Sequence, residues 1–468
     1  MKSNWIKYSF IIFAAILLQS CLSVKEYTRV EDIEKQAYYR TDMLPKDSIS
    51  MADFSYTAIF KDEILQEHIA NGLKNNLDIR LALQNIATSQ AYLKQAKSAY
   101  LPALNGGPSV QYGTNSLNTP LGAFSTDREW NTQFNLGLNS SWELDVWGKL
   151  KSAEKAQYAS YLQTVAAHQA VKSSIVRGVA SIYFRLLALD EQYKTTEESI
   201  NLQEKSLETT KALKEAGQVT EVAVQQTEAL LFNYKSRLIE TANAIKIAEN
   251  QMSYLMGETP HEIKRSSIDN QMIPTEMKTG YPVDLLRNRP DVLAAEYHVM
   301  AAFQNSQVAR LNMYPTLNIS LGGGLQSGEI ENFFDANSLF ANILGGLTQP
   351  IFQQRKLKTQ KEVSEIAQQS ALLNFRKAVL TASQEVSDAL QTYQSQDEII
   401  ALKTQEYENY NRATAYSQEL LNYGMANYLE VITAQQNALN AKLAEINAKS
   451  TKLNAMVDLY SALGGGWQ

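Results

Sequence analysis

Residues 130–142 alternate between apolar and polar side chains along most of their length. The apolar positions are Trp130, Phe134, Leu136, Leu138 and Trp142. The positions between them are Asn131, Gln133, Asn135, Asn139 and Ser141. A period of two is typical of a β-strand whose two faces meet different surroundings. The segment is therefore predicted to be a strand with one apolar face and one amide-rich face.

The later part of the chain repeats this pattern. Leu317, Ile319, Leu321 and Leu325 alternate with Asn318, Ser320 and Gln326, and a similar run covers 339–347. We expect two strands in each half of the chain, joined by loops near 115–129 and 327–337. Such strands suit the wall of a membrane barrel, with lipid outside and water inside, and Trp130 and Trp142 would lie at the two membrane interfaces. The alternative is one sheet of a soluble sandwich, whose strands also alternate.

Four strands are too few to close a membrane barrel, which needs about eight or more. A barrel built from this chain must therefore be shared between copies. Two copies would give eight strands, whose interior fills with side chains, whereas three would give twelve strands and a lumen.

Two long segments, 151–216 and 354–422, contain no proline and are predicted to be helices of roughly 100 Å each. In the second, apolar residues recur every seven positions in two adjoining stripes: Ile366, Leu373 and Leu380, and Leu372, Val379, Val386 and Tyr393. Two stripes predict a helix packed between neighbours on both sides, whereas a free-standing dimeric coiled coil would need only one. Gly217 and Gly424 would end these helices in the left-handed conformation. Shorter helices, about 220–256 and 427–462, would then return.

The two halves share landmarks in the same order. Asp78 and Asp291 are each followed after 24 residues by a proline, Pro102 or Pro315. Gly217 and Gly424 are each followed after 40 residues by Gly257 or Gly464. We therefore predict a duplicated unit. Repeat 1 covers 61–257 and is opened by a helix at about 61–99. An irregular linker follows at 258–282. Repeat 2 covers 283–464, opened by a helix at about 283–313, and the C-terminal end is 465–468.

The N-terminus has the pattern of a targeting signal. Lys2 and Lys7 precede a short apolar run at 8–18, as in a signal peptide. Leu18-Gln19-Ser20-Cys21 follows and resembles the lipobox of bacterial lipoproteins, in which Cys21 would carry the lipid. We expect residues 1–20 to be removed and 21–60 to form the lipid anchor and an equatorial segment. The remaining chain has no apolar run of about 18 residues, so a membrane span would have to be β.

Composition excludes several other classes of function. The 468 residues carry a formal charge of -6 and no basic stripe, so nucleic acid is not expected as a partner. Cys21 is the only cysteine, and the four histidines have no metal-ligand spacing. No nucleotide-binding or catalytic motif is present, and the glycine run at 322–324 lies within a strand pattern. We expect no enzyme activity, no cofactor and no metal.

Several motifs together resemble the TolC-type outer-membrane efflux factors, and the lipobox points to their OprM-like, NodT-type lipoprotein branch. The most specific motifs are 142–148 (WELDVWG), 289–292 (RPDV), 348–352 (TQPIF) and the two glycine turns. The resemblance implies a mostly α fold, a homotrimer with a small twelve-stranded membrane barrel, and a helical tunnel in the periplasm. It also implies an equatorial domain built from 22–60, 258–282 and the C-terminal end.

The same resemblance assigns roles to the tips of the helices. Residues 213–222 and 420–429 would dock a periplasmic adaptor protein. The central tip residues are Gly217, Gln218 and Val219 in the first copy, and Gly424, Met425 and Ala426 in the second. Acidic residues six and nine positions after the second-copy glycine constrict the entrance in this family, and here those positions are Glu430 and Thr433. The counterparts in the first copy are Ala223 and Gln226, so the resemblance implies one ring of carboxylates. The alternative is that Glu430 is a solvated helix charge or an intrahelical partner.

The expected function is passive conduction across the outer membrane. An inner-membrane transporter of the RND type and its adaptor would deliver drugs or other small molecules to the tunnel. A duct for protein secretion is the alternative within the channel class. A lipid-anchored coiled-coil protein without a pore is the alternative from another class.

Overall fold

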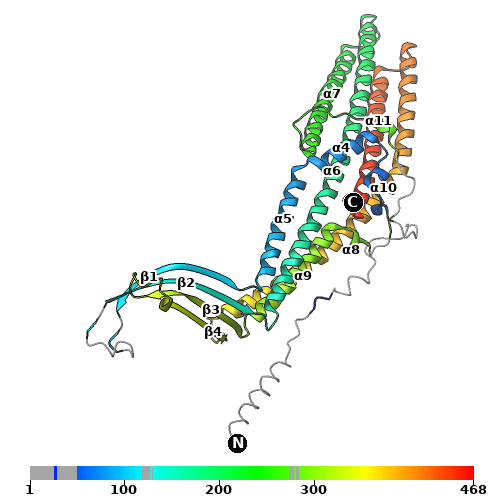
Figure 1. Cartoon of the computed structure of the whole chain (residues 1–468). Coiled ribbons are helices and arrows are strands. Elements are labelled where there is room, and N and C mark those ends of the chain that lie inside the picture. The colour runs from blue at the N-terminus through cyan, green and yellow to red at the C-terminus, as the bar shows by residue number, and fades with distance from the viewer. Residues whose placement is uncertain are drawn as a thin grey trace. The chain divides into compact units, whose positions relative to one another are not determined.

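In the residues that the structure describes, the protein is mostly helical and contains one sheet (Figure 1). The computed structural model describes residues 26–28, 50–114, 116–118, 127–128, 130–272, 279–280 and 284–468. Cys21 and the predicted signal at 1–20 lie outside the described residues, as does most of the segment 21–60. Among the helices of the described residues, none combines the length and the apolar character needed to cross a membrane.

The chain divides into two compact units. The strand unit contains the described residues of 26–28, 87–162 and 296–373, and the helical unit contains those of 50–86, 163–295 and 374–468. The boundaries fall inside four helices: α5 (Leu77–Ser98), α6 (Lys149–Glu215), α9 (Pro290–Leu311) and α10 (Lys356–Asn422).

The strand unit is built around a four-stranded antiparallel sheet in the order β1-β2-β3-β4. Its strands are β1 (Ala103–Thr114), β2 (Trp130–Leu144), β3 (Thr316–Ser327) and β4 (Leu339–Thr348). The second halves of the two hairpins start where the sequence pattern predicts them, at Trp130 and Leu339. β1 and β4 form the two edges of this sheet.

Cross-strand pairing gives the sheet two different faces. Leu136 pairs with Leu325, and Leu321 pairs with Ile343, so apolar side chains gather on what we call the apolar face. Asn105, Asn139 and Asn342 lie in one row on the opposite, amide face, with Gly322 between the last two. The predicted alternation is therefore confirmed in β2 and β3.

The glycine run at 322–324 has a packing role in this sheet. Gly107, Gly137, Gly324 and Phe340 form one row across the four strands. A Cβ on Gly137 would lie 3.9 Å from the ring of Phe340, and one on Gly324 would lie 2.0 Å from the carbonyl oxygen of Leu136. The glycines therefore leave room for an aromatic ring on the amide face and for close approach of two strands.

Hydrogen bonds from indole and amide side chains fix the segments that connect strands to helices. The Trp142 indole donates a hydrogen bond to the carbonyl oxygen of Tyr100 at 2.8 Å, and the Trp147 indole donates to that of Pro315 at 2.6 Å. Gln349 donates to the carbonyl oxygen of Met313 at 3.0 Å. The Asp145 carboxylate accepts from the first backbone amides of α6. These contacts give a structural role to the motifs at 142–148 and 348–352.

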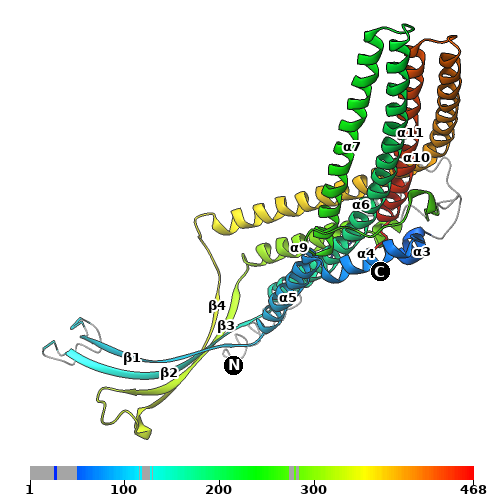
Figure 2. The ribbon, with the colours of Figure 1, turned by 90° about the horizontal axis from the view of Figure 1, so that it is seen from above.

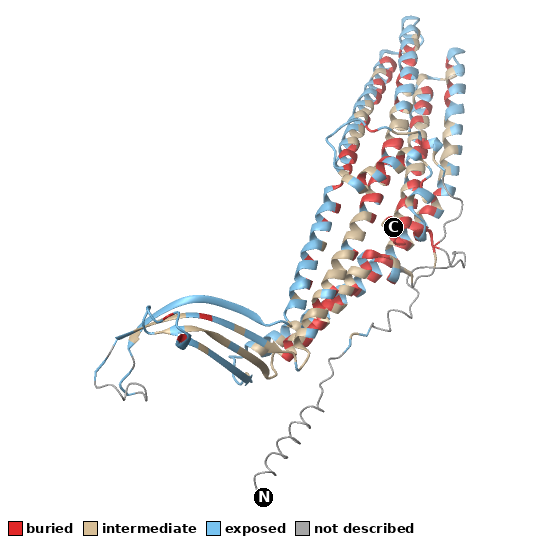
Figure 3. Cartoon of the chain, in the orientation of Figure 1, coloured by how far each residue is buried: buried red, intermediate tan, exposed pale blue. Residues whose placement is uncertain are grey.

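Four helices lie side by side in the helical unit (Figure 2). They are the parts of α6 and α10 that belong to this unit, α7 (Glu221–Met256) and α11 (Tyr428–Ala462). α6 and α10 have 67 residues each, which corresponds to roughly 100 Å at 1.5 Å per residue. Buried side chains are concentrated in this unit, whereas β1 and β4 are mostly exposed and β3 is mostly intermediate (Figure 3).

The predicted opening helices are each divided in two, which corrects the prediction. In place of 61–99 the structure has α4 (Glu63–Asn75) and α5, preceded by a short α3 (Tyr56–Ile59). In place of 283–313 it has α8 (Leu285–Asn288) and α9. The first break occurs because the Asn76 side chain caps α5 by accepting hydrogen bonds from the amides of Asp78 and Ile79. The second occurs because Pro290 opens α9, which forces Arg289 out of the helix.

The residues at these two breaks make equivalent contacts. Asn76 donates a hydrogen bond to the carbonyl oxygen of Leu255 at the end of α7, at 2.9 Å. Arg289 donates to the carbonyl oxygen of Ala462 at the end of α11, at 3.0 Å. Leu255 and Ala462 each lie two residues before a helix-ending glycine. The duplication is thus visible in individual hydrogen bonds, and we call these contacts the Asn76 joint and the Arg289 joint.

The helix-ending glycines complete both joints. Gly257 and Gly464 have φ of 71° and 99°, in the left-handed region that favours glycine. A Cβ on Gly257 would lie 2.7 Å from the carbonyl oxygen of Asn75, and one on Gly464 would lie 2.5 Å from that of Asn288. Each copy therefore closes by bringing the end of its returning helix against the break in its opening helix.

The linker between the copies is held by Asp62. The Asp62 carboxylate accepts hydrogen bonds from Tyr183 at 2.8 Å, Ser266 at 2.5 Å and Gln271 at 2.8 Å. Burial alone would raise the pKa of Asp62, but the hydrogen bonds from these residues and from the Ile64 amide outweigh it and lower the pKa. The anionic carboxylate therefore ties the linker to α4 and α6.

Candidate functional site: the helical tips

Both tips are built by the same hydrogen-bonded turn. At the first, Gln218 donates to the carbonyl oxygen of Leu213 and Gly217 to that of Lys214, both at 2.9 Å. At the second, Met425 donates to the carbonyl oxygen of Leu420 at 2.9 Å and Gly424 to that of Leu421 at 3.0 Å. This is the Schellman pattern, and the two glycines have φ of 74° and 69°. The predicted left-handed caps are confirmed.

The side chains of the second tip are large, apolar and exposed. Tyr423 and Met425 are more than 70% exposed, and Leu429 is also exposed. In the first tip Val222 is the corresponding exposed large apolar residue. No heavy atom lies within 4 Å of a Cβ built on Gly217 or Gly424, so both turns project into open space. The tips therefore offer apolar contact area that the chain itself does not cover.

The two tips are stabilised by different polar contacts. In the first, the Lys214 ammonium lies 2.6 Å from the Glu221 carboxylate, across the turn. The hydrogen bond between them raises the pKa of Lys214 and lowers the pKa of Glu221. In the second, Asn427 caps α11 by accepting a hydrogen bond from the Glu430 amide at 3.1 Å, and its side-chain amide donates to the Glu430 carboxylate at 3.0 Å. Each turn thus carries its own local clamp.

The predicted aperture residues Glu430 and Thr433 are both exposed and lie on the first turns of α11. Their counterparts in the first copy differ, because Ala223 is fully buried and Gln226 accepts a hydrogen bond from Tyr428 at 3.1 Å. The copies are therefore unequal at the tip, as the sequence comparison expects. The Asn427 contact also gives Glu430 a role in capping its own helix.

The predicted interface aromatics lie at opposite ends of the same face of β2. Trp130 is exposed and stacks on Tyr112, with ring centroids 5.1 Å apart. Trp142 is less exposed and is fixed by its bond to Tyr100. Twelve residues of strand separate the two indoles, which corresponds to roughly 40 Å.

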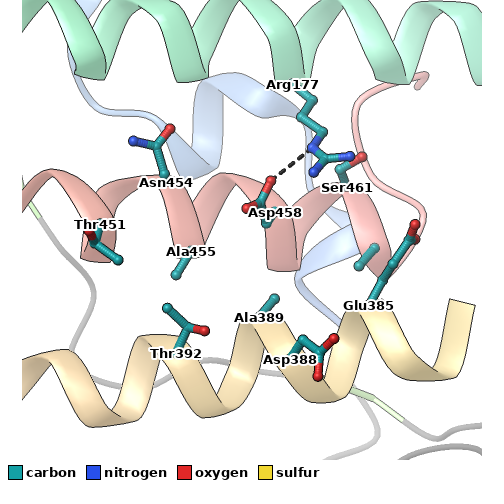
Figure 4. Close-up of a pocket in the computed structure, with 11 residues that line it drawn as sticks. Arg177, Glu385, Asp388, Ala389, Thr392, Thr451, Asn454, Ala455, Asp458 and Ser461 are labelled. Atoms are coloured by element: carbon teal, nitrogen blue, oxygen red, sulfur yellow. Dashed lines mark hydrogen bonds and ion pairs between the residues drawn. The ribbon is translucent and has the colours of Figure 1, made fainter. Parts of the chain in front are cut away.

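A polar pocket of about 270 Å³ opens between α6, α10 and α11 in the helical unit (Figure 4). Two of its three carboxylates have cationic partners: Asp458 bonds Arg177 at 2.8 Å, and Glu385 bonds Arg289 at 2.6 Å. Asp388 accepts from Gln384 on its own helix. Within the described residues no cluster of His, Cys, Asp and Glu could hold a metal ion. The pocket wall therefore consists of helix-linking contacts and contains none of the predicted site residues.

The sequence patterns assigned no role to two arginines, Arg289 at the Arg289 joint and Arg265 in the linker, that form ion pairs with residues of other elements. Arg289 is 6% exposed, and its guanidinium also bonds Asp291 at 2.6 Å. Arg265, in the linker, bonds Asp190 at 2.5 Å and Glu249 at 2.6 Å. The position of Arg289 in the repeated motif, aligned with Asn76, was the available signal. For Arg265 the sequence pattern offered none.

Comparison with known proteins gives one consistent result. The family model described as outer membrane efflux protein matches residues 69–258 and 281–465. The chain is 26% identical over 466 residues to the solvent efflux pump outer membrane protein SrpC of Pseudomonas putida, covering 98% of each protein. It is 25% identical over 456 residues to the cation efflux system protein CusC of Escherichia coli O6:H1, covering 97% of each.

Solved structures show the same fold. The outer-membrane channel OprN superposes with a TM-score of 0.84 at 21% sequence identity, covering 95% of this chain and 99% of that one. Both halves of the chain, with their strands and their long helices, are included in the family match. The chain therefore belongs to the outer membrane efflux protein family and is an outer-membrane efflux channel subunit.

Proposed function

We propose that three copies of this chain form a passive exit duct for small molecules. An inner-membrane transporter of the RND type and a periplasmic adaptor would deliver the molecules to it. The observation that carries the proposal is the sheet, which has two open edges, one apolar face and one amide face. Four strands from each of three copies would join edge to edge into a twelve-stranded barrel, with amides toward the water-filled lumen.

The dimensions of the strands support a membrane span. The strands have 10 to 15 residues, compared with the 9–11 that a tilted transmembrane strand needs. The roughly 40 Å between Trp130 and Trp142 shortens to about 30 Å along the membrane normal at a tilt of about 40°. That distance matches the thickness of a hydrocarbon core, so the two indoles would lie at its two boundaries.

Exposed apolar stripes on the outer helices support the assembly of copies. On α7, Phe232 and Ile239 are seven residues apart and both exposed. On α10, Leu373 and Leu380 show the same spacing and exposure. A heptad stripe left open to water is the seam that a neighbouring helix covers in a coiled coil. A second copy of the chain is the neighbour that would cover it here.

The tips support docking of a partner protein. Tyr423, Met425 and Leu429 form an exposed apolar surface on a turn that is itself held by hydrogen bonds. A preorganised apolar knob suits a groove on another protein, because little conformational entropy is lost on binding. We assign this surface to the periplasmic adaptor.

The client is proposed to be a small solute. SrpC belongs to a solvent efflux pump and CusC to a cation efflux system, so both names refer to small molecules or ions. The amide face of the sheet suits small solutes of several kinds, because amide side chains offer hydrogen bonds without attracting one ion strongly. Movement through the duct would follow the concentration gradient that the pump maintains.

Glu430 is the proposed gate residue. In a trimer three Glu430 carboxylates would face one another around the axis, which favours cations and opposes closure by mutual repulsion. Glu430→Ala should therefore reduce the preference for cations over anions in single-channel recordings of purified protein in a planar bilayer. Glu419→Ala, which removes an exposed carboxylate from the nearby end of α10, serves as the matched control.

Two outcomes would contradict the proposal at different levels. Unchanged selectivity and conductance in Glu430→Ala would remove Glu430 from the gate and leave its capping contact with Asn427 as its role. Absence of any conductance, in protein whose tips have been opened, would argue against the duct itself.

A further inference from the structure

The β3–β4 loop, residues 328–338, folds back onto the apolar face of the sheet. Phe333 is only 8% exposed because its ring packs edge-on against Phe134, with centroids 6.4 Å apart. Phe134 belongs to the same alternating set as Trp130, Leu136 and Leu138, so this contact is made on the apolar face. The loop therefore covers the side of the sheet that is proposed to face lipid.

Hydrogen bonds within the loop hold it in this shape. Ser338 donates to the carbonyl oxygen of Asn332 at 2.6 Å, and the Asn332 amide donates to the Glu329 carboxylate at 2.8 Å. Asp335 donates its backbone N–H to the carbonyl oxygen of Asn332 at 3.1 Å. The loop is thus a folded turn that joins the end of β3 to the start of β4 (Figure 2).

The outer surface of this turn is unusually apolar for a loop. Phe334 is 80% exposed and Ile330 is 59% exposed, although Phe333 beside them is buried. On the apolar face of β4, the strand that follows the loop, Leu339 and Ile343 are also exposed. The Phe334 ring packs edge-on against Phe333, with centroids 5.2 Å apart, so a chain of rings leads from Phe134 on the apolar face to the exposed surface of Phe334. Apolar surface that stays exposed in this way marks a contact site.

The charges of the loop define the kind of neighbour. Glu329, Glu331 and Asp335 alternate with the apolar residues, and Glu331 and Asp335 are exposed to solvent. An element with apolar and acidic groups side by side suits the boundary between hydrocarbon and head groups, where rings are buried and charges stay in water. Tyr112 and Trp130 also stack on the apolar face, at the end of the sheet where the β3–β4 loop lies.

We propose that the β3–β4 loop is a lipid anchor that inserts Phe334 and Ile330 into the interface of the outer membrane. The proposal rests on the proposed function, because it requires the apolar face of the sheet to contact lipid. The loop would extend the aromatic girdle beyond the strands and fix how deep each subunit lies in the membrane. The partner is the lipid surface itself.

Spin labels on single introduced cysteines test this assignment in full-length protein reconstituted into phosphatidylethanolamine–phosphatidylglycerol vesicles. Phe334→Cys and Ile330→Cys report the loop, and Glu331→Cys is the matched control on the same turn. Ile343→Cys reports the apolar face of β4, independently of the loop. The unaltered chain, whose one cysteine is Cys21, measures background labelling.

The expected result is that labels at positions 334, 330 and 343 collide more with oxygen than with a water-soluble nickel complex, whereas the label at 331 shows the reverse. If position 343 reports lipid but 334 and 330 behave like 331, the lipid anchor is overturned and the proposed function stands. If position 343 also reports water, the sheet does not contact lipid and the proposed function fails with the anchor.

Discussion

Replacement of Arg289 by alanine tests the joint that closes the second copy. The guanidinium of Arg289 is nearly buried and bonds three groups: Asp291 at 2.6 Å, Glu385 at 2.6 Å and the carbonyl oxygen of Ala462 at 3.0 Å. Burial alone would lower the pKa of Arg289, but the two carboxylates raise it, so the side chain stays charged. Arg289→Ala would leave all three acceptors without this donor.

The size of the effect follows from the exposure of the partners. Breaking a fully buried ion pair costs about 3–5 kcal/mol, because the remaining charge stays buried. Asp291 and Glu385 are nearly half exposed, so water can solvate both carboxylates after the change. We therefore expect about 2 kcal/mol, mostly from the charged hydrogen bonds and the freed Ala462 carbonyl.

Hydrogen exchange of the backbone amides at the end of α11 is the appropriate measurement, because the loss is local. The amides of Leu463, Gly464 and Gly465 are bonded within this helix end. A loss of about 2 kcal/mol corresponds to roughly 30-fold faster exchange, since about 1.4 kcal/mol is tenfold. Arg287→Ala is the matched control, because Arg287 is exposed and its pair with Asp284 is long at 3.5 Å.

The reasoning would be refuted by equal exchange rates in Arg289→Ala and Arg287→Ala. Arg289→Lys gives a second comparison, because lysine keeps the charge but cannot contact all three acceptors with one planar group. Its exchange rate should lie between those of the parent protein and Arg289→Ala.

Three further predictions concern Asp62 and the linker, the helix-ending glycines, and lipid attachment at Cys21. The pKa of Asp62 is lowered in the folded protein, so its contribution to stability is present above its ordinary pKa and is lost as the pH falls below about 4. Asp62→Asn should therefore flatten the acid dependence of the melting temperature measured by circular dichroism. An unchanged slope would exclude Asp62 as the source of that dependence. Gly464→Ala should lower the melting temperature more than Gly217→Ala. A Cβ at 464 meets the backbone of Asn288, whereas one at 217 meets open space and costs only about 1–2 kcal/mol of backbone strain. Equal losses would show that the contact with Asn288 does not matter. Cys21→Ala should abolish incorporation of labelled palmitate, and continued labelling would refute the lipobox.

The pattern of the chain predicts the elements whose cause is local. Gly217 and Gly424 end the long helices where expected, because the left-handed cap depends on the glycine itself. The two faces of the sheet follow from alternation over a few residues, as between Leu136 and Asn135. The packing roles of Gly322 and Gly324 were missed, since they depend on other strands: a Cβ on Gly322 would meet the Asn342 side chain, and one on Gly324 would meet the Leu136 backbone.

Contacts between distant parts of the chain could not be read from these patterns. Asn76 and Leu255 are 179 residues apart, and Arg289 and Ala462 are 173 apart. Apolar periodicity describes which face of a helix is buried, but it does not say which side chain reaches the end of another helix. The break at Asn76 has a local cause, the cap on the amides of Asp78 and Ile79, but it was missed because the stretch around it has helical character throughout.

The chemical difference between the Asn76 joint and the Arg289 joint affects how a duplicated chain folds. During folding each opening helix meets two similar returning helices, α7 and α11, and must close onto the one from its own copy. If Arg289 were placed against the end of α7, it would lose its ion pair with Glu385. If Asn76 were placed against the end of α11, Glu385 would have no cationic partner. Wrong pairing of the halves would therefore lose the ion pair and the charged hydrogen bonds of Arg289, which correct pairing keeps. The position shared by Asn76 and Arg289 is thus one at which the chain distinguishes its two copies.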